Sequence, residues 1–226
     1  MTGRSTEDLV QQLVRNLRPV KPIARLRVAA AGTLALWIAA VVATGWLTGT
    51  WPRFGEAVFW LDPLALAILL GLGVVAAGAV VAALASAVPG RERLVRAGGI
   101  GAGIAAVWLI GCGICAVGGG AAESAGGLFA GCVSCLLHAV VLAIPAALAA
   151  SFYLSRGAPR HRLFASGVAA AGAAGLGALA VHATCSAVGG FHLLLGHCLT
   201  PMIAGLVFAL PLAVLVQRWS PAAIEP

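Results

Sequence analysis

Long apolar runs, separated by short polar breaks, dominate the sequence. Each run is long enough to cross a bilayer as a helix, because a membrane-spanning helix needs roughly 20 apolar residues. None shows the alternating apolar and polar segments of ~10 residues that are typical of a membrane barrel. The pattern therefore predicts an all-α polytopic membrane protein, a six-transmembrane-helix bundle. The six predicted helices are Val28–Leu47, Leu64–Val88, Ala97–Val117, Leu128–Phe152, Leu163–Ala183 and Leu193–Val216.

The composition supports this interpretation. Of the 226 residues, 61% are hydrophobic and 9% are charged, which is far from the composition of an average soluble domain. The 27 mostly polar residues before the first run contain no secretory signal, so we expect the chain to begin in the cytoplasm. The predicted organisation is a cytoplasmic segment over residues 1–27, a transmembrane domain over 28–216 and a cytoplasmic tail over 217–226.

The basic residues are strongly biased to one side of the predicted membrane. Thirteen of the 14 lie before the first run, after the second, after the fourth or after the last, and all of these positions share one side. Only Arg53 lies on the other side, close to Glu56 and Asp62. The positive-inside rule then predicts a multi-pass protein of a bacterial inner membrane with both termini in the cytoplasm. This bias explains the net charge of +7, so the charge is no evidence for nucleic-acid binding and we expect none. The lipid bilayer is an expected partner because of the six apolar runs.

In this topology every cysteine falls in the outer half of the membrane. The cysteines lie at the ends of the third and fifth predicted helices and at the starts of the fourth and sixth, with histidines close by. At about 1.5 Å rise per residue the set spans roughly 15 Å of depth, so we interpret it as one site shared by the last four helices. The cluster contains Cys112, Cys115, Cys132, Cys135, Cys185 and Cys198, with His138, His182, His192 and His197.

The residues alone leave three interpretations of this cluster open. Cysteine in a membrane helix often serves as a small packing residue, although histidine there is costly and usually marks a function. Thiolates and imidazoles in fours bind soft or borderline metal ions, and Cys132, Cys135 and His138 follow one another at one-turn spacing. Thiols outside the cytoplasm also form disulfides, and a helix N-terminus, as predicted near Cys132 and Cys135, favours the reactive thiolate. No nucleophile, histidine and acid set is visible, so we predict no enzyme activity.

The segment before the first run predicts a short amphipathic helix. Leu9, Leu13 and Leu17 recur at helical spacing on one face, and Arg18 follows them just before two prolines. A helix of about 13 residues is marginal alone in water, so its apolar face needs a partner. The membrane surface and a groove on a partner protein are both suitable, and the sequence does not choose between them.

Several motifs in order along the chain resemble those of the NrsF-type membrane anti-sigma factors. They are "EDLVQQLVRNLRPVKPIARLR", "DPLALAILL" followed by "VPGRE", "CLLHAVVLAIPA" followed by "SRGAPRHR", and a cysteine and a histidine twelve residues apart, Cys185 and His197. The resemblance covers nearly the whole chain. It implies a six-span inner-membrane protein that sequesters an extracytoplasmic-function sigma factor through its N-terminal segment. It also implies release of that factor under heavy-metal or oxidative stress.

The resemblance further implies which cysteines are functional. The family positions fall on Cys135, which begins "CLL", and on Cys185, whose spacing to His197 is kept. We therefore expect these two thiols to share a metal ion or form a disulfide, with Cys132, His138 and His197 as candidate further ligands. No cofactor is obligatory in this hypothesis, although a soft or borderline metal ion is a candidate for the cluster.

Two alternative functions are considered beside this one. A quinone-coupled membrane thiol-disulfide oxidoreductase also pairs cysteines at outer helix ends, but the chain has neither a thioredoxin-like domain nor a polar quinone site. The second alternative is a metal-binding membrane protein such as a metal transporter. A transporter needs metal ligands along a path through the whole membrane. The inner halves of the six predicted helices contain no Asp, Glu, His or Cys, so transport is disfavoured.

Overall fold

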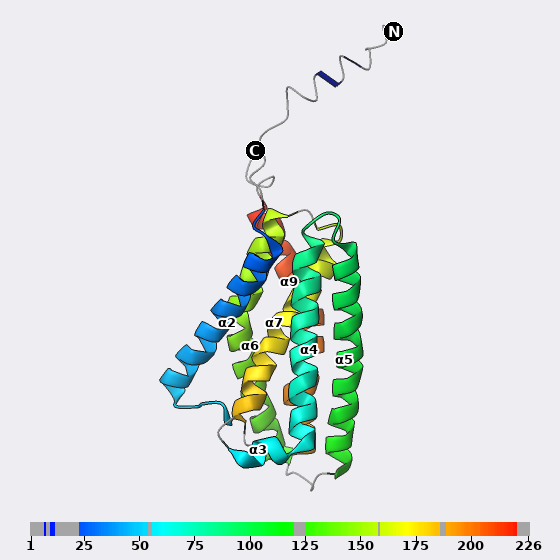
Figure 1. Cartoon of the computed structure of the whole chain (residues 1–226). Coiled ribbons are helices and arrows are strands. Elements are labelled where there is room, and N and C mark those ends of the chain that lie inside the picture. The colour runs from blue at the N-terminus through cyan, green and yellow to red at the C-terminus, as the bar shows by residue number, and fades with distance from the viewer. Residues whose placement is uncertain are drawn as a thin grey trace.

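The computed structural model describes residues 7, 10–11, 23–53, 56–119, 125–157, 159–185 and 189–220, with the backbone alone for 57–58 and 125–130. Within these ranges the regular elements are all helical, and six helices are long and apolar enough to cross a membrane. The elements are α2 (Leu26–Thr48), α3 (Ala57–Leu61), α4 (Pro63–Ser86), α5 (Glu92–Gly119), α6 (Ala125–Arg156), α7 (Arg162–Thr184), α8 (Gly190–Leu193), a π-helical turn (Leu194–Cys198) and α9 (Thr200–Trp219) (Figure 1).

The predicted all-α, six-helix membrane fold is confirmed. Each predicted span lies within or close to one long helix, and several helices run past the apolar run that predicted them. α5 begins at Glu92 and α6 ends at Arg156, beyond the predicted Ala97 and Phe152. Helices continue into the polar interface of a bilayer, so the apolar run underestimates their length.

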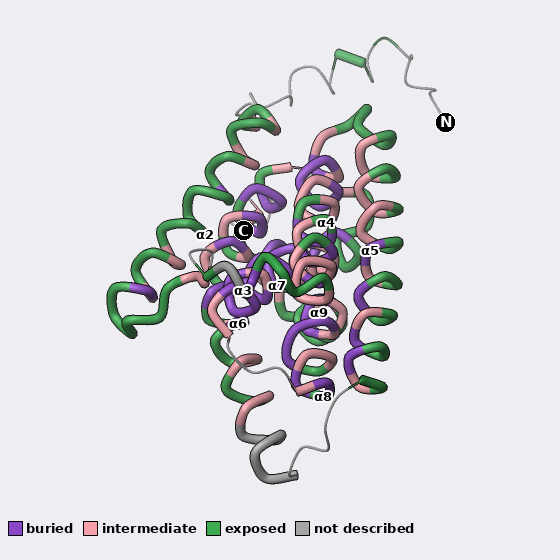
Figure 2. Tube along the Cα trace, turned by 60° about the horizontal axis from the view of Figure 1, so that its bottom comes forward, coloured by how far each residue is buried: buried purple, intermediate pink, exposed green. Residues whose placement is uncertain are grey.

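The helix α7 forms the centre of the bundle. In its most apolar stretch 72% of the residues are buried, against 6% in α2. Figure 2 shows buried positions gathered on α7 and on the facing sides of its neighbours. Its sequence is dominated by alanine and glycine, which let neighbouring helices approach closely where lipid offers no hydrophobic driving force between them.

Glycines make these approaches at specific points. A Cβ at Gly172 would lie 2.9 Å from the backbone nitrogen of Val80 on α4, and one at Gly167 would lie 3.1 Å from the carbonyl oxygen of Gly205 on α9. A Cβ at Gly177 would overlap the carbonyl of Ala139 on α6. Any larger residue at these positions would force α7 away from a neighbour, so small side chains hold the bundle together.

The first spanning helix, α2, is the least attached. Its start is fixed to α6 by a hydrogen bond that the hydroxyl of Tyr153 donates to the carbonyl of Ala24, at 2.9 Å. Figures 1 and 2 show its other end standing away from the bundle. From there the chain returns through Arg53 and α3 to α4, whose first turn is capped by the Asp62 carboxylate accepting from the amides of Leu64 and Ala65.

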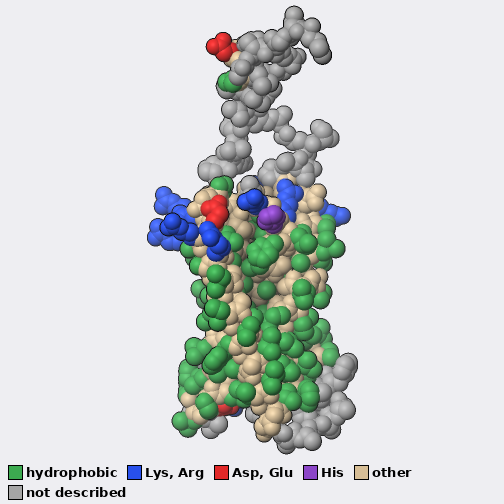
Figure 3. Space-filling model, turned by 90° about the vertical axis from the view of Figure 1, so that its right-hand side faces the viewer, with side chains coloured by type: hydrophobic (Ala, Val, Ile, Leu, Met, Phe, Trp, Pro, Cys, Tyr) green, Lys and Arg blue, Asp and Glu red, His purple; other side chains and the backbone are tan. Residues whose placement is uncertain are grey.

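The two ends of the bundle differ in chemistry. At one end, called here the basic end, α2, α5 and α7 begin and α4, α6 and α9 finish. Arg side chains gather there on the face that Figure 3 shows. At the other end, called here the cysteine end, α5 and α7 finish and α6 and α8 begin. Between the two ends, the face in Figure 3 is largely hydrophobic, and exposed large apolar side chains lie on all six spanning helices, as contact with a bilayer requires.

Candidate functional site

Four side chains at the cysteine end meet in one cluster. They are Cys135, Cys185, His192 and His197, and one ligand atom from each lies within 4.8 Å of the other three. The two sulfur atoms are 3.7 Å apart, and the Cys185 sulfur is 3.3 Å from Nε2 of His192. Nε2 of His192 is in turn 3.2 Å from Nε2 of His197. Both imidazoles are buried, and both thiols are half-buried.

Close helix contacts bring these residues together. Cys135 lies one turn before Ala139 on α6, at the point where Gly177 lets α7 approach. Cys185 directly follows the last residue of α7, so its position depends on the same contact. On the other side, Gly196 lies against the Cys135 side chain, because a Cβ at Gly196 would be 3.6 Å from the Cβ of Cys135.

The π-helical turn positions the two histidines. In an α-helix residues five apart point about 140° away from each other, since each residue turns about 100°. The amide of Leu199 instead donates to the carbonyl of Leu194, five residues back, at 2.9 Å. This wider turn places positions five apart on the same side, so the rings of His192 and His197 lie 5.1 Å apart. The irregular turn therefore serves to present both imidazoles to the thiols.

A third histidine supports the cluster without joining it. The buried side chain of His182 directs its Nε2 at the carbonyl oxygen of Ala65 on α4, at 3.0 Å. Its ring packs at 72° against the ring of His197, with centroids 5.2 Å apart. His182 therefore helps to fix the plane of the His197 ring.

Two kinds of chemistry fit this arrangement. Two thiolates and two imidazoles are the ligands of tetrahedral sites for borderline metal ions. The two thiols are also close enough for a disulfide after a small movement, because the sulfur atoms must approach from 3.7 Å to the bonding distance of about 2.0 Å. A bound metal ion and a disulfide would each join α6 to the end of α7.

The comparisons with known proteins bear on the whole chain. The family described as "Negative regulator of sigma F" matches residues 13–219, nearly the full length. The chain belongs to the NrsF family. No curated protein and no solved structure matches it. The NrsF resemblance of the sequence motifs is thereby confirmed, and the protein is a negative regulator of a sigma factor by family.

In this NrsF protein the other residues expected at the site take different positions. Cys198 is fully buried in an apolar cluster that Cys112 borders. Cys115 is exposed on α5. Cys132 lies one turn before Cys135 on α6, where its backbone faces Gly196. His138 is exposed, and its Nδ1 lies 2.8 Å from the carbonyl oxygen of Ser134 on its own helix.

The start of α6 changes one step of the thiol argument. The helix begins at Ala125, so Cys132 lies about two turns and Cys135 nearly three turns inside it. The helix dipole acts mainly within the first turn. The expected activation of these thiolates by a helix N-terminus therefore does not apply to Cys135 in this NrsF protein.

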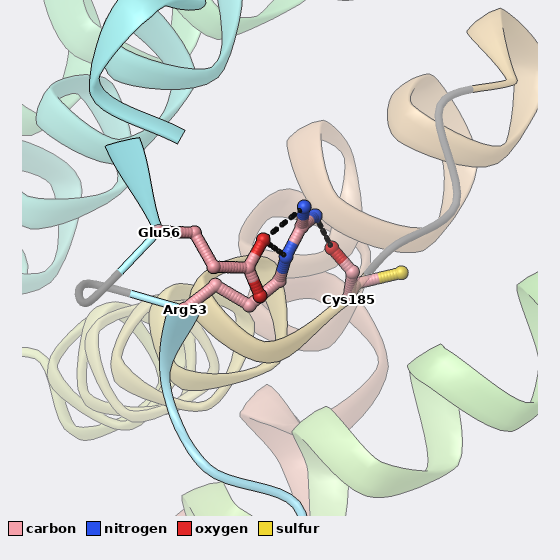
Figure 4. Close-up of polar contacts among 3 residues, drawn as sticks. All are labelled: Arg53, Glu56 and Cys185. Carbon is pink, nitrogen blue, oxygen red and sulfur yellow. Dashed lines mark hydrogen bonds and ion pairs between the residues drawn. The ribbon is translucent and has the colours of Figure 1, made fainter. Parts of the chain in front are cut away.

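An ion pair at the cysteine end was not anticipated. Arg53 donates from Nε and Nη2 to one carboxylate oxygen of Glu56, at 2.8 and 2.6 Å, and from Nη1 to the carbonyl of Cys185, at 3.2 Å (Figure 4). The hydrogen bonds from Arg53 hold the pKa of Glu56 below its ordinary value. The segment between α2 and α3 is thus tied to the residue that ends α7. The sequence feature that could have indicated this ion pair is that Arg53 is the one basic residue separated from the other thirteen.

A cavity gives access to the thiols. It has a volume of about 200 Å³ and lies between α2, α6 and α7. Cys135, Cys185 and His138 line it, together with Thr44 and Thr48 of α2. An ion or a small oxidant that reaches the cysteine end of this NrsF protein therefore has a route to both sulfur atoms.

Proposed function

We propose that this NrsF protein is an inner-membrane anti-sigma factor that holds an extracytoplasmic-function sigma factor and releases it when the thiols at the cysteine end meet a heavy metal or an oxidant. The observation that carries the proposal is the pairing of Cys135 and Cys185, whose sulfur atoms lie 3.7 Å apart although 50 residues separate them in sequence. We assign it no catalytic reaction.

The charge distribution supports an orientation for this function. Basic side chains gather at one end of the bundle, and the positive-inside rule assigns that end to the cytoplasm (Figure 3). Both termini then lie in the cytoplasm, where a sigma factor is found. The cysteine end lies at the outer surface, where metals and oxidants arrive first.

Either signal would tie α6 to α7. A metal ion would accept lone pairs from both sulfur atoms after the thiols lose their protons. An oxidant would take two electrons while the two thiols lose two protons and form one S–S bond. Both events would shift the cysteine end of α7, which packs along its length against α4, α6 and α9.

A small change in packing is sufficient for release. Rigid helices held by alanine and glycine contacts pass a shift at one end to the other when two packings exist. The sigma factor leaves if the second packing binds it less well, and ~1.4 kcal/mol of difference is tenfold in affinity.

The sigma factor would bind the segment before α2. Leu9, Leu13, Leu17 and Arg18, which carry this prediction, lie outside the described residues. A Leu13→Asp variant places a charge in the middle of the predicted apolar face, so it is expected to abolish co-purification of the sigma factor with the full-length protein. Normal co-purification with this variant would exclude the segment as the binding site.

The decisive experiment measures release in cells. A reporter for the regulated sigma factor is compared in cells with the wild-type protein, Cys135→Ser, Cys185→Ser and the matched control Cys115→Ser, each with and without Zn²⁺ or peroxide. The first two variants are expected to hold the sigma factor under both stresses, and the control is expected to release it as the wild type does. Normal release by both site variants would reduce the cluster to packing and overturn the proposal.

A further inference from the structure

We infer that Cys135, Cys185, His192 and His197 form a tetrahedral two-thiolate, two-imidazole site for Zn²⁺ and ions of its class. The inference deepens the proposed function by naming the ion and its full ligand set. Its regulatory meaning rests on that function, whereas binding of the ion does not.

The spacing of the ligand atoms matches a tetrahedron around Zn²⁺. With Zn–S near 2.3 Å and Zn–N near 2.0–2.1 Å, the edges of such a tetrahedron are about 3.8 Å for S–S, 3.5 Å for S–N and 3.3 Å for N–N. The corresponding distances here are 3.7 Å between the sulfur atoms, 3.3 Å from Cys185 to His192 and 3.2 Å between the imidazole nitrogens. Three of the six edges therefore already match the tetrahedron, and the other three are no longer than 4.8 Å, so small adjustments would complete the site.

The donor set selects the class of ion. Thiolates and imidazoles suit Zn²⁺ and similar borderline ions, whereas Mg²⁺ and Ca²⁺ prefer oxygen ligands. The charge also fits the location, because two thiolates and one divalent ion sum to zero and the two imidazoles are neutral. A neutral complex is much less costly to bury at the end of a membrane bundle than a charged one.

The two histidines argue for an ion and against a simple thiol pair. Their Nε2 atoms point toward one another at 3.2 Å, and both are buried. Without an ion, two neutral imidazoles facing in this way share one N–H···N hydrogen bond, and an ion bound between them would use the lone pairs of both Nε2 atoms. The π-helical turn that creates this meeting is an irregularity of the kind often found at functional sites. A disulfide between Cys135 and Cys185 would use neither histidine.

The ligands come from three separate parts of the bundle. Cys135 belongs to α6, Cys185 follows α7, and the two histidines belong to α8 and the π-helical turn that leads into α9. One bound ion would therefore join the ends of three spanning helices. The cavity that Cys135 and Cys185 line offers the path by which the ion reaches them.

The test uses the full-length protein, purified in detergent with its thiols reduced and stripped of metal. Co²⁺ is titrated as an optical probe for a tetrahedral thiolate site, and the zinc-loaded protein is studied by X-ray absorption. We expect one ion per chain, visible Co²⁺ bands typical of tetrahedral sites, and a zinc shell of two sulfur and two nitrogen atoms. A shell of three or four sulfur atoms, a shell without sulfur, or no bound ion would overturn the inference.

Variants test the contribution of the histidines. His192→Ala is expected to weaken Co²⁺ binding on the order of 100-fold, one ligand's share of the affinity of a four-ligand zinc site. His138→Ala, and the matched control His161→Ala at the basic end, are expected to bind as the wild type does. Equal affinities for His192→Ala and His161→Ala would overturn the inference. If His192→Ala does not fold, the X-ray absorption of the wild-type protein decides alone.

The outcomes separate this inference from the proposed function. If the purified protein binds the ion through all four ligands while Cys135→Ser and Cys185→Ser still release the sigma factor in cells, the site stands and its regulatory role is wrong. If release requires both cysteines but the reduced protein binds no ion, the regulatory role stands through a disulfide and the metal site is wrong.

Discussion

The contact between α6 and α7 at Gly177 offers a sharp test of how the site is held. A Cβ at Gly177 would overlap the carbonyl oxygen of Ala139 and lie 2.9 Å from its carbonyl carbon, where ordinary contact begins at 3.4 Å. Gly177→Ala therefore forces the two helices apart by at least about 0.5 Å, and on the order of 1 Å once the oxygen is accommodated. Overpacking of this kind typically costs about 1–3 kcal/mol.

The same displacement reaches the ligands. Cys135 is one turn from Ala139, and Cys185 is about two turns beyond Gly177, which is roughly 12 Å along the helix. Metal sites tolerate shifts of only about 0.2 Å in their bond lengths. A separation on the order of 1 Å between α6 and α7 would therefore pull the two sulfur atoms out of one coordination sphere.

We expect two measurable effects of Gly177→Ala. At about 2–4 °C per kcal/mol for a chain of this size, the melting temperature in detergent falls by about 2–12 °C. Co²⁺ binding weakens by about 10-fold or more, as for disturbed metal surroundings in general. The matched control is Gly103→Ala, since no atom lies within 4 Å of a Cβ there and alanine favours a helix. Equal melting temperatures and Co²⁺ affinities for the two variants would show that the Gly177 contact does not hold the site.

Three further substitutions test separate contacts. Thr200→Val removes a hydroxyl that donates to the carbonyl of Gly196 in the π-helical turn, at 2.9 Å; a loss of about 1 kcal/mol should weaken Co²⁺ binding about 5-fold in a titration. Tyr153→Phe removes the hydrogen bond from α6 to the Ala24 carbonyl at the start of α2. The free energy of unfolding, measured by thermal unfolding, should fall by about 1 kcal/mol. Arg53→Gln should lower the melting temperature at neutral pH. Because the pKa of the Glu56 carboxylate is held below the ordinary 4.5, the part of this difference that comes from the ion pair is present above about pH 5 and lost as the pH falls through the lower folded value. The part that comes from the hydrogen bond to the Cys185 carbonyl remains.

The sequence predicted the number and class of the helices because a membrane makes this part of the problem simple. Apolar runs of sufficient length have one stable outcome in a bilayer, so the six spans were found with ends wrong by a few residues. The central position of α7 was harder to predict. All spans contain alanine and glycine, and the faces that meet are identified by contacts in the structure, such as those of Gly177 with Ala139 and of Gly172 with Val80.

The site was predicted in part. The depth of the cysteines along their helices predicted that they share one end of the bundle, and the family motifs selected Cys135 and Cys185, whose sulfur atoms lie 3.7 Å apart. His192 was counted in the cluster but not among the candidate further ligands. In a regular α-helix residues five apart point about 140° away from each other, so helical spacing does not pair it with His197. The five-residue π-helical turn beginning at Leu194 brings the two histidines together, and no local residue pattern predicts such a turn.

The contacts around Cys185 indicate how a signal would reach the N-terminal segment, which the proposed function places in the cytoplasm. Its thiol belongs to the cluster, while its carbonyl accepts from Arg53, which follows α2 in the chain. Few residues of α2 are buried, and one face of it, which carries Ala29, Trp37 and Val41, packs against the bundle, while Tyr153 fixes its start. A movement of Cys185 on binding an ion would therefore act on both ends of a loosely packed helix: through Arg53 at the cysteine end, and through α6 and Tyr153 at the basic end. A weakly held helix with two fixed ends yields to such a movement at lower cost than the buried α7 does, so α2 is the element best placed to carry the change to a bound sigma factor.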